Sequence, residues 1–416
     1  MSPATIKGIR ALLLENVNAA AVESFRAAGI DVEHHTKALP EAELREKLQT
    51  AHIVGIRSKT QLTASLIADA PNLIAIGCFC IGTNQVDLEA ASAAGIAVFN
   101  SPFSNSRSVA ELVIAEIITL SRQLGDRNRE MHQGVWNKVS AQCYEIRGKT
   151  LGIVGYGHIG TQLSVLAEAM GMHVIFYDVL QLMPLGAARP TASLNDLLSR
   201  ADVVTLHVPE TPETRSLIGK DQLEKMRPGA FLINASRGTV VDIDALAVAL
   251  RSGALGGAAV DVYPKEPRSN GPGFESALRD CPNTILTPHI GGSTEEAQSA
   301  IGIEVSSALL RFISRGSSLG AVNVPEVDLR ANGKRIIRVL HMHNNVPGVL
   351  GRINEILSSF NVEKQICESR GALAYLMLDL SLDAGEAQGK TDDEVAGSLR
   401  QELAKVPETI KTRILS

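Results

Sequence analysis

The chain has 416 residues and a formal net charge of −5, and 45% of its residues are hydrophobic. This length predicts two or three domains, because one hydrophobic core rarely organises so long a chain. The acidic balance argues against binding to nucleic acid or an anionic membrane, and we expect neither a membrane span, since no apolar run approaches roughly 20 residues, nor a secretory signal.

The five cysteines are odd in number and scattered along the chain. Only Cys78 and Cys80 lie close together, without a His or a second Cys pair at the spacing of a zinc site. A metal site there is the weaker alternative. We expect free thiols in a reducing, cytoplasmic compartment and no metal.

Short apolar runs alternate with amphipathic stretches through most of the chain, a pattern typical of parallel sheets covered by helices on both faces. The first series of predicted strands is 10–14, 52–56, 73–77 and 96–99. A helix over 106–122 separates it from a second series at 151–154, 174–177, 203–206, 231–233, 257–260 and 284–286.

A further helical pattern over 293–314 is long enough to return the chain to the first α/β unit. The predicted fold class is therefore α/β, with two Rossmann-like doubly wound domains, one inserted in the other. We expect a substrate-binding domain made of 1–104 and 293–328, and a nucleotide-binding domain over 105–292.

The pattern changes after a predicted linker at 326–334. The order of elements in 335–416 is βαββαβ, typical of a small ferredoxin-like domain. Its strands are expected at 335–342, 362–368, 373–382 and 409–415, and its helices at 349–360 and 392–404. This domain contains no evident catalytic cluster, so a binding or regulatory role is the first hypothesis.

A G-x-G-x-x-G motif at Gly155, Gly157 and Gly160 directly follows an apolar strand and opens a helix. The first glycine permits a tight turn, the second lets a pyrophosphate approach the backbone, and the third lets helix and strand pack closely. The alternative is an ordinary glycine-rich turn, which this position between strand and helix disfavours.

The residues after the motif extend the interpretation. His158 and Ile159 lie at a helix N-terminus, where free N–H groups favour an anion. Asp178 ends the next strand, close to the spacing expected of an acid that binds ribose hydroxyls. A carboxylate there repels a 2′-phosphate, so the motif predicts NAD rather than NADP.

Three polar residues each come just after a predicted strand, where ligands bind in open α/β sheets. Arg237 suits a substrate carboxylate, and His289 could serve as general acid/base with Glu266 as its partner. Taken singly, each could be an ordinary surface or capping residue. Their order behind a dinucleotide motif favours the catalytic interpretation.

At these residues the chain resembles the D-2-hydroxyacid dehydrogenase family over most of 5–325. The motifs that carry the resemblance are 155–160, 234–238 and 288–292, with narrower signals at 77–87 and 102–111. The resemblance implies the three catalytic roles above. It implies cofactor contacts from Gly155, Gly157, His158, Ile159, Gly160, Asp178, Ala235, Ser236, Arg237, Asp261, His289, Gly291 and Gly292. It also implies substrate contacts from Arg57, Ser58, Asn105 and Gln298.

The narrower segments are similar to the branch of this family that oxidises D-3-phosphoglycerate, the first step of L-serine biosynthesis. Arg57 and Lys59 supply the positive charge that a phosphate needs in an acidic protein, although Lys59 could equally be a solvated surface charge. The resemblance further implies a homotetramer. We also expect reduction of 2-oxoglutarate as a side activity, because it too is a 2-oxo acid with a second distal anion.

The C-terminal domain resembles an ACT domain, a module that binds amino acids at subunit interfaces, with L-serine as the implied effector. His343 and Asn345 match serine-contacting positions, whereas Glu363 departs from an expected Asn. A carboxylate at that position could accept from the serine ammonium group but would repel its carboxylate. The alternative is a purely structural role in dimerisation.

Other functions remain open at this point. Within the family these are hydroxypyruvate or glyoxylate reductase, D-lactate dehydrogenase and formate dehydrogenase. Outside catalysis they are an NAD-sensing corepressor and an amino-acid sensor for a partner protein. Trp136, the single tryptophan, could face a cleft or a neighbouring subunit, or could simply pack.

Overall fold

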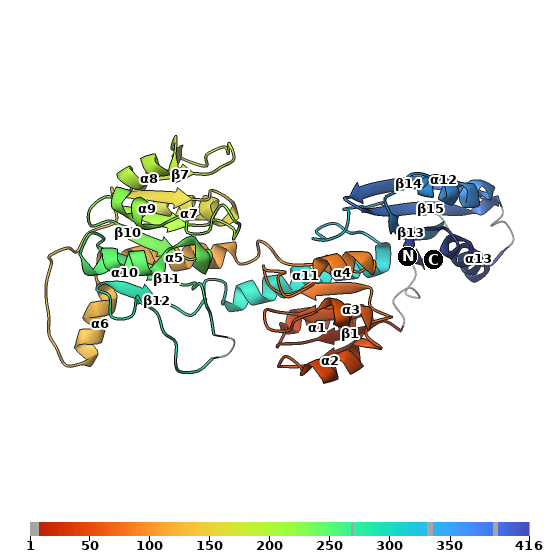
Figure 1. Ribbon diagram of the computed structural model, residues 1–416, viewed down its shortest axis with the longest axis horizontal. Helices are drawn as coiled ribbons and strands as arrows, with labels where there is room; N and C mark the ends of the chain where they lie inside the picture. The colour runs from red at the N-terminus through yellow and green to blue at the C-terminus, as the bar shows by residue number, and fades with distance from the viewer. Residues whose placement is uncertain (1–7, 268–269, 331–335, 386–389, 416) are drawn as a thin grey trace. The chain divides into compact units, whose positions relative to one another are not determined.

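The computed structural model describes residues 8–267, 270–330, 336–385 and 390–415. Its elements form two compact units, Met1–Pro102 with Ser299–Ser416, and Phe103–Gln298 (Figure 1). The chain leaves the first unit, builds the second and returns through helix α11 (Glu295–Arg315), as expected for one domain inserted in another. The chain passes from the first unit to the second after Pro102 and returns after Gln298.

The N-terminal part of the first unit is a parallel five-stranded sheet in the order β2-β1-β3-β4-β5. Its strands are β1 (Arg10–Leu13), β2 (Asp31–His34), β3 (Ile53–Ile56), β4 (Ala75–Cys78) and β5 (Ala97–Phe99). Its helices are α1 (Ala19–Ala27), α2 (Glu41–Leu48), α3 (Ala64–Ala68) and α4 (Leu88–Ala93).

Burial on both faces explains the continuous apolar runs of these strands. Leu13 points toward α1 and α11, whereas Leu12 points toward α2, α3 and α4. Successive side chains of a strand alternate between faces, so a strand covered on both sides has no polar positions.

The second unit is a parallel seven-stranded sheet in the order β12-β11-β10-β9-β6-β7-β8. Its strands are β6 (Thr150–Val154), β7 (His173–Tyr177), β8 (Arg189–Pro190), β9 (Val203–Leu206), β10 (Phe231–Asn234), β11 (Gly257–Val260) and β12 (Thr284–Leu286). Its helices are α5 (Ser106–Ser121), α6 (Leu124–His132), α7 (His158–Ala169), α8 (Leu194–Arg200), α9 (Lys220–Lys225), α10 (Ile243–Arg251) and the short 3-10 helix η2 (Gly238–Val240). The order is that of a Rossmann fold with one added edge strand, and α5 and α7 cover one face while α8, α9 and α10 cover the other.

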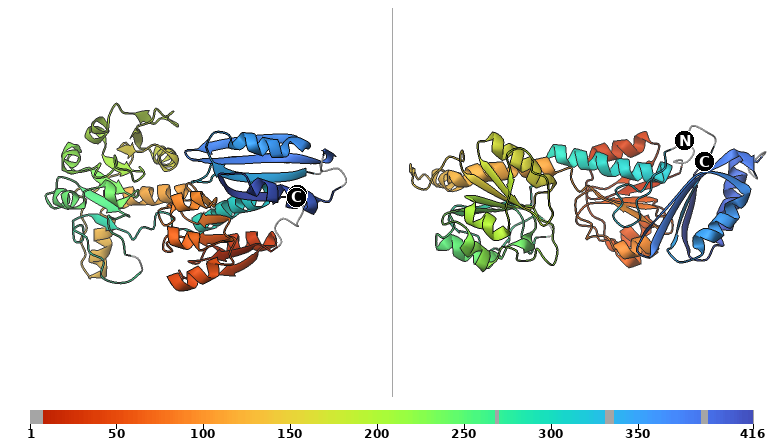
Figure 2. Two further views of the ribbon diagram at one scale, coloured as in Figure 1. Left: turned by 45° about the vertical axis from the view of Figure 1, so that its right-hand side comes forward. Right: turned by 90° about the horizontal axis from the view of Figure 1, so that it is seen from above.

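The C-terminal part of the first unit is an antiparallel four-stranded sheet in the order β14-β15-β13-β16. Its elements are β13 (Ile336–Asn344), α12 (Val349–Ile356), η3 (Leu357–Ser359), β14 (Phe360–Arg370), β15 (Leu373–Gly385), α13 (Asp392–Ala404) and β16 (Thr409–Leu415). The predicted βαββαβ order is confirmed. Both α-helices lie on one face of this sheet (Figure 2).

The other face of this antiparallel sheet packs against α11. Leu340, Met342 and Tyr375 join the same hydrophobic cluster as Leu309 and Phe312 of α11. Within the sheet, Arg338 and Asp379 form a bidentate ion pair with N–O distances of 2.6 and 2.8 Å, and both side chains are only 2% exposed. This shared core explains why the C-terminal domain belongs to the first unit.

Three elements escaped the sequence patterns, and each lacks a continuous apolar run. Strands β2 and β8 are edge strands with exposed polar residues, and α6 has no buried residue. Part of the predicted linker, residues 331–334, and the first residue of the strand predicted from 335 lie outside the described residues. In the described part of the chain, no helix combines the length and apolar character needed to cross a bilayer.

The buried ion pair gives a stability prediction. We expect Arg338→Met to lower the free energy of unfolding by about 3–5 kcal/mol, because it leaves Asp379 charged, buried and unpaired. The double variant Arg338→Met/Asp379→Leu should recover most of the loss, since no lone charge remains. Chemical denaturation followed by circular dichroism checks both, and a single variant as stable as the wild type would contradict the prediction.

Candidate active site and cofactor cradle

The glycine-rich loop joins β6 to α7 at the point where the strand order of the second unit reverses. Gly155 has a φ of +90°, and a Cβ there would lie 2.4 Å from the carbonyl oxygen of His207. A Cβ on Gly160 would lie 2.4 Å from the carbonyl oxygen of Gly155, whereas nothing lies within 4 Å of a Cβ on Gly157. The outer two positions therefore need glycine for backbone packing, and the middle one opens a space that fits the pyrophosphate of NAD.

Asp178 lies beside this loop at the end of β7. Its Oδ2 accepts the backbone N–H of Tyr156 at 2.8 Å, and its Oδ1 accepts that of Leu180 at 2.9 Å. His158 begins α7, and its ring stacks on Phe103 with 3.6 Å between ring centres. A held carboxylate next to a free helix N-terminus suits a ribose diol followed by a pyrophosphate.

The imidazole of His289 and the carboxylate of Glu266 meet at the same edge of the sheet. His289 Nδ1 lies 2.8 Å from Glu266 Oε2, and Glu266 Oε1 accepts the backbone N–H of Tyr263 at 3.1 Å. His289 has a φ of +55°, a left-handed conformation uncommon for a non-glycine residue. Such strain persists where surrounding contacts hold a functional side chain in place.

The pair shifts the pKa of both partners. The hydrogen bond and the charge of Glu266 raise the pKa of His289 above its ordinary value, although burial acts the other way. Burial alone would raise the pKa of Glu266, but hydrogen bonds from His289 and the backbone of Tyr263 outweigh it and lower that pKa. The pair therefore favours an imidazolium hydrogen-bonded to a carboxylate.

Arg237 follows β10 and is half-buried. Its guanidinium donates to the carbonyl oxygen of Ser236 at 2.7 Å, and its own carbonyl oxygen accepts from Asn234 Nδ2 at 3.0 Å. Its positive charge lowers the pKa of both His289 and Glu266, so the three predicted catalytic residues lie close enough to interact. Ala235 and Ser236 lie in the same turn, where Asn234 Oδ1 accepts the N–H and the hydroxyl of Ser236.

Asp261 organises the loop that carries His289. Its carboxylate is 1% exposed and accepts the hydroxyl of Thr287 at 2.6 Å and the N–H groups of Ile290 and Gly291, each at 2.8 Å. Its backbone carbonyl accepts the N–H of His289 at 2.8 Å. Asp261, which the sequence predicts as a cofactor contact, thus also holds this loop in place through hydrogen bonds.

Asn105 and Gln298 both lie beside Gly292 in the second unit. A Cβ on Gly292 would lie 2.4 Å from Asn105 Nδ2, and Gln298 Nε2 donates to the carbonyl oxygen of Gly292 at 3.2 Å. Asn105 is 8% exposed, and its Oδ1 finds no hydrogen-bond partner in the described chain. Arg57 and Ser58, the other predicted substrate residues, follow β3 in the first unit.

Glu116 is a buried acid that the sequence patterns missed. It lies on α5, is 3% exposed, and neither of its carboxylate oxygens has a hydrogen-bond partner among the described residues. Burial, reinforced by the charge of Asp261, raises its pKa to about 8, so it is protonated at neutral pH. A lone Glu on the apolar face of a helix, between Val113 and Leu120, was the available signal.

The predicted effector residues do not meet within one chain. His343 lies on β13 opposite Ala374, whereas Glu363 on β14 lies between residues that face Asp379 and Leu380. At roughly 3.4 Å per residue this separates them by about 20 Å along the sheet. Asn345 lies near His343 and donates to the carbonyl oxygen of Gly371 at 3.3 Å.

His343 and Glu363 also differ in their surroundings. The side chain of His343 is 3% exposed, and its Nδ1 has no hydrogen-bond partner among the described residues. Glu363 is partly exposed and accepts from Asn361 Nδ2 at 3.3 Å. One ligand could touch both ends only across two copies of this domain.

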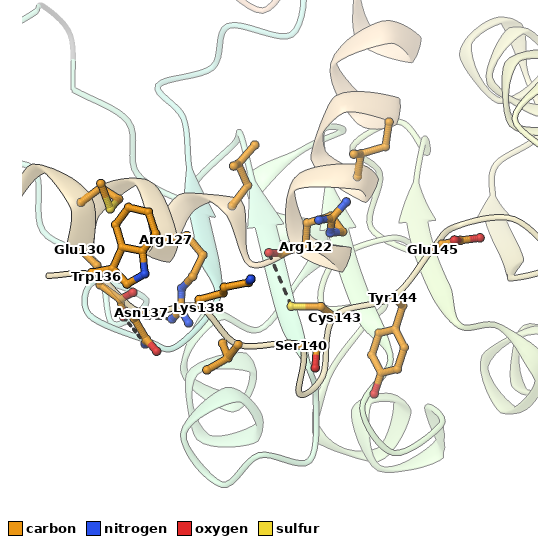
Figure 3. Close-up of a pocket in the computed structure, with 14 residues that line it drawn as sticks. Arg122, Arg127, Glu130, Trp136, Asn137, Lys138, Ser140, Cys143, Tyr144 and Glu145 are labelled. Carbon is orange, nitrogen blue, oxygen red and sulfur yellow. Dashed lines mark hydrogen bonds and ion pairs between the residues drawn. The ribbon is translucent and has the colours of Figure 1, made fainter.

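A cavity of about 750 Å³ lies in the second unit (Figure 3). Helix α6, the end of α5 and the segment 136–145 line it, and Trp136 is 80% exposed. Neither Arg237, Glu266 nor His289 lines this cavity.

The chain is similar to known proteins over nearly its whole length. Residues 114–291 match the family of D-isomer specific 2-hydroxyacid dehydrogenases, NAD binding domain. The chain is 57% identical to D-3-phosphoglycerate dehydrogenase 2 of Saccharomyces cerevisiae, over 92% of this chain and 84% of the yeast protein. It is 50% identical to D-3-phosphoglycerate dehydrogenase of Escherichia coli K12, over 98% of this chain and 97% of that protein.

The chain is also similar to solved structures. A D-isomer specific 2-hydroxyacid dehydrogenase from Lactobacillus delbrueckii ssp. bulgaricus, in an NAD-complexed form, matches 75% of this chain and 100% of its own with a TM-score of 0.68 and 25% identity. The TT0316 protein from Thermus thermophilus matches 74% of this chain and 97% of its own with a TM-score of 0.67 and 33% identity. Because relatives this similar cover nearly the whole chain, the chain belongs to the D-isomer specific 2-hydroxyacid dehydrogenases and uses NAD as its cofactor.

Proposed function

We propose that the protein oxidises D-3-phosphoglycerate to 3-phosphohydroxypyruvate with NAD, the first step of L-serine biosynthesis. The observation that carries the proposal is the His289–Glu266 pair, with a distance of 2.8 Å, within electrostatic reach of Arg237 in an NAD-binding fold. The names of the yeast and Escherichia coli relatives support this choice of substrate.

The proposed roles follow from the geometry. Because Nδ1 of His289 bonds Glu266, its Nε2 is left to take the proton from the substrate hydroxyl. The guanidinium of Arg237 binds the substrate carboxylate and polarises the developing carbonyl. Glu266 stabilises the imidazolium that forms. Bound NAD supplies the hydride acceptor.

The other end of the substrate needs a phosphate site. Arg57 and Ser58 would hold the phosphate, and Asn105 and Gln298 would contact the rest of the substrate. 2-Oxoglutarate also pairs a 2-oxo acid with a second distal anion, so its reduction is the proposed side activity.

We propose L-serine as a feedback effector that binds between two copies of the C-terminal domain. His343 and Asn345 of one copy and Glu363 of another would contact it, because these residues lie at opposite ends of the sheet in one chain. Asn361, beside Glu363, would supply a neutral amide where the carboxylate alone would repel the serine carboxylate.

A homotetramer is the proposed assembly, with one contact through these C-terminal domains and one through the nucleotide-binding domains. The exposed Trp136 and the exposed apolar residues near it suit the second contact; these are Leu124, Met131, Val135 and Val139. All five cysteines are free, which supports the proposed cytoplasmic location.

The substrate is tested by NADH oxidation with 3-phosphohydroxypyruvate, hydroxypyruvate and 2-oxoglutarate in parallel, each with and without L-serine. We expect a strong preference for the phosphorylated substrate and suppression by serine. Equal rates with all three would leave a general 2-oxo acid reductase, and NADH binding without turnover would favour a sensor or corepressor. Rates indifferent to serine would leave the C-terminal domain with a structural role.

His289→Ala should lower kcat by at least about 10²-fold, because the general acid/base is lost. NADH binding, followed by fluorescence titration, should persist. His173→Ala is the control, since His173 is exposed at the amino end of β7, the opposite edge of the sheet. Turnover in the His289 variant equal to that of the control would refute the assignment.

Glu266→Gln should move the pH dependence to lower pH. The carboxamide can still accept the hydrogen bond of His289 but no longer raises its pKa by charge. Oxidation needs neutral His289, so it is lost as pH falls through this pKa, and the variant should retain activity to lower pH. Reduction needs the imidazolium and should be lost at lower pH than in the wild type.

Steady-state rates across pH in both directions check this prediction. Glu275→Gln is the matched control, because Glu275 is an exposed acid of the same unit that pairs with Arg279. Profiles that coincide for the wild type and Glu266→Gln would show that Glu266 does not tune His289.

A further inference from the structure

The strand order of the first sheet favours ligand binding at one point along its edge. In the order β2-β1-β3-β4-β5 the direction of winding reverses between β1 and β3. Ligands of such sheets bind at this switch point, outside the carboxyl ends of the two strands. Glu15 comes just after β1, and the segment Arg57–Thr60 directly follows β3, so both lie at this switch point.

Glu15 holds the C-terminal end of this segment. Its side chain is 7% exposed, and its two carboxylate oxygens accept successive backbone N–H groups, from Lys59 at 2.9 Å and Thr60 at 2.7 Å. Hydrogen bonds to an ionised acceptor are stronger than those between neutral groups. Here both carboxylate oxygens bind the same short stretch of backbone.

Gln85 holds the N-terminal end of the same segment. It is 3% exposed, and its Nε2 donates to the carbonyl oxygen of Arg57 at 2.8 Å and to that of Gly82 at 3.1 Å. Two buried side chains therefore hold the backbone on either side of Ser58, while the side chains of Arg57 and Lys59 add two positive charges.

The turn that presents Glu15 is itself strained. Glu15 and the next residue, Asn16, have φ values of +63° and +55°. The N–H groups of both are bonded to the carbonyl oxygens of Lys37 and His35. Non-glycine residues persist in this conformation when their surroundings over-determine it, commonly at ligand sites.

We propose that Glu15 is a positioning residue for the substrate phosphate, because it holds the amides of Lys59 and Thr60 and thereby sets Arg57 and Ser58 in place to bind it. The inference rests on the proposed function. A carboxylate near a phosphate site should weaken it through space. If Glu15 acted only by charge repulsion, removing its charge would lower the KM for the phosphorylated substrate. If Glu15 positions the loop, removing its charge raises that KM.

The variant Glu15→Gln distinguishes these two effects on the KM. The carboxamide keeps one acceptor oxygen but turns an NH₂ toward a backbone donor, so at least one of the two bonds is lost. We expect the KM for 3-phosphohydroxypyruvate to rise at least about tenfold, the scale of one charge-assisted hydrogen bond. The kcat, and the KM for unphosphorylated hydroxypyruvate, should stay close to the wild-type values. An unchanged or lowered KM for the phosphorylated substrate would overturn the inference.

Asn323→Ala is the matched control for a merely structural effect. Asn323 is also buried in the first unit, and its side chain also bonds backbone, to the N–H of Val98 and the carbonyl oxygen of Ile96, each at 2.8 Å. It should lower the melting temperature without changing the preference for the phosphorylated substrate. Equal loss of that preference in both variants would refute a specific role for Glu15.

Hydrogen exchange without substrate gives a second measurement. The amides of Lys59 and Thr60 should exchange faster in Glu15→Gln than in the wild type, and equal exchange would contradict the inference. A wild-type enzyme that does not prefer the phosphorylated substrate overturns the proposed function and the inference with it. A wild type with that preference, retained in Glu15→Gln, overturns the inference alone.

Discussion

Parallel strands joined by helical crossovers leave their carboxyl ends at one edge of a sheet, and this constraint brings the candidate site residues of the protein together. Arg237, Glu266 and His289 follow three neighbouring strands, β10, β11 and β12, although they are far apart in sequence. The same geometry brings the glycine-rich loop after β6 and Asp178 after β7 together. In the first unit it brings Glu15 to the backbone of Lys59 and Thr60.

Buried carboxylates hold these edges by accepting backbone N–H groups. Asp261 accepts backbone N–H groups of the loop that carries His289, and Glu15 accepts those of the loop that carries Arg57. A buried charge is costly unless such donors satisfy it, so each acid and the loop around it depend on each other. This dependence also explains how His289 and Glu15 sustain positive φ values.

The C-terminal domain is anchored to the end of α11 by donors on its sheet. Arg413 bonds the carbonyl oxygens of Phe312 and Ile313, Tyr375 bonds that of Gly316, and Arg338 bonds that of Arg315. Terminal helix carbonyls lack partners within the helix, so these side chains satisfy them. Helix α11 itself begins at Glu295, shortly after His289 in the chain.

The sequence by itself determined the fold class, the βαββαβ tail, the family and its NAD cofactor, because buried parallel strands and the glycine motif carry strong local patterns. It also singled out Arg237, Glu266 and His289 by their positions after strands. Only the tertiary structure showed that His289 and Glu266 touch, that Glu15 and Gln85 clamp the Arg57 loop, and that His343 and Glu363 lie apart. Those facts depend on strand order and register, which bring distant segments together and which no local pattern in one sequence records.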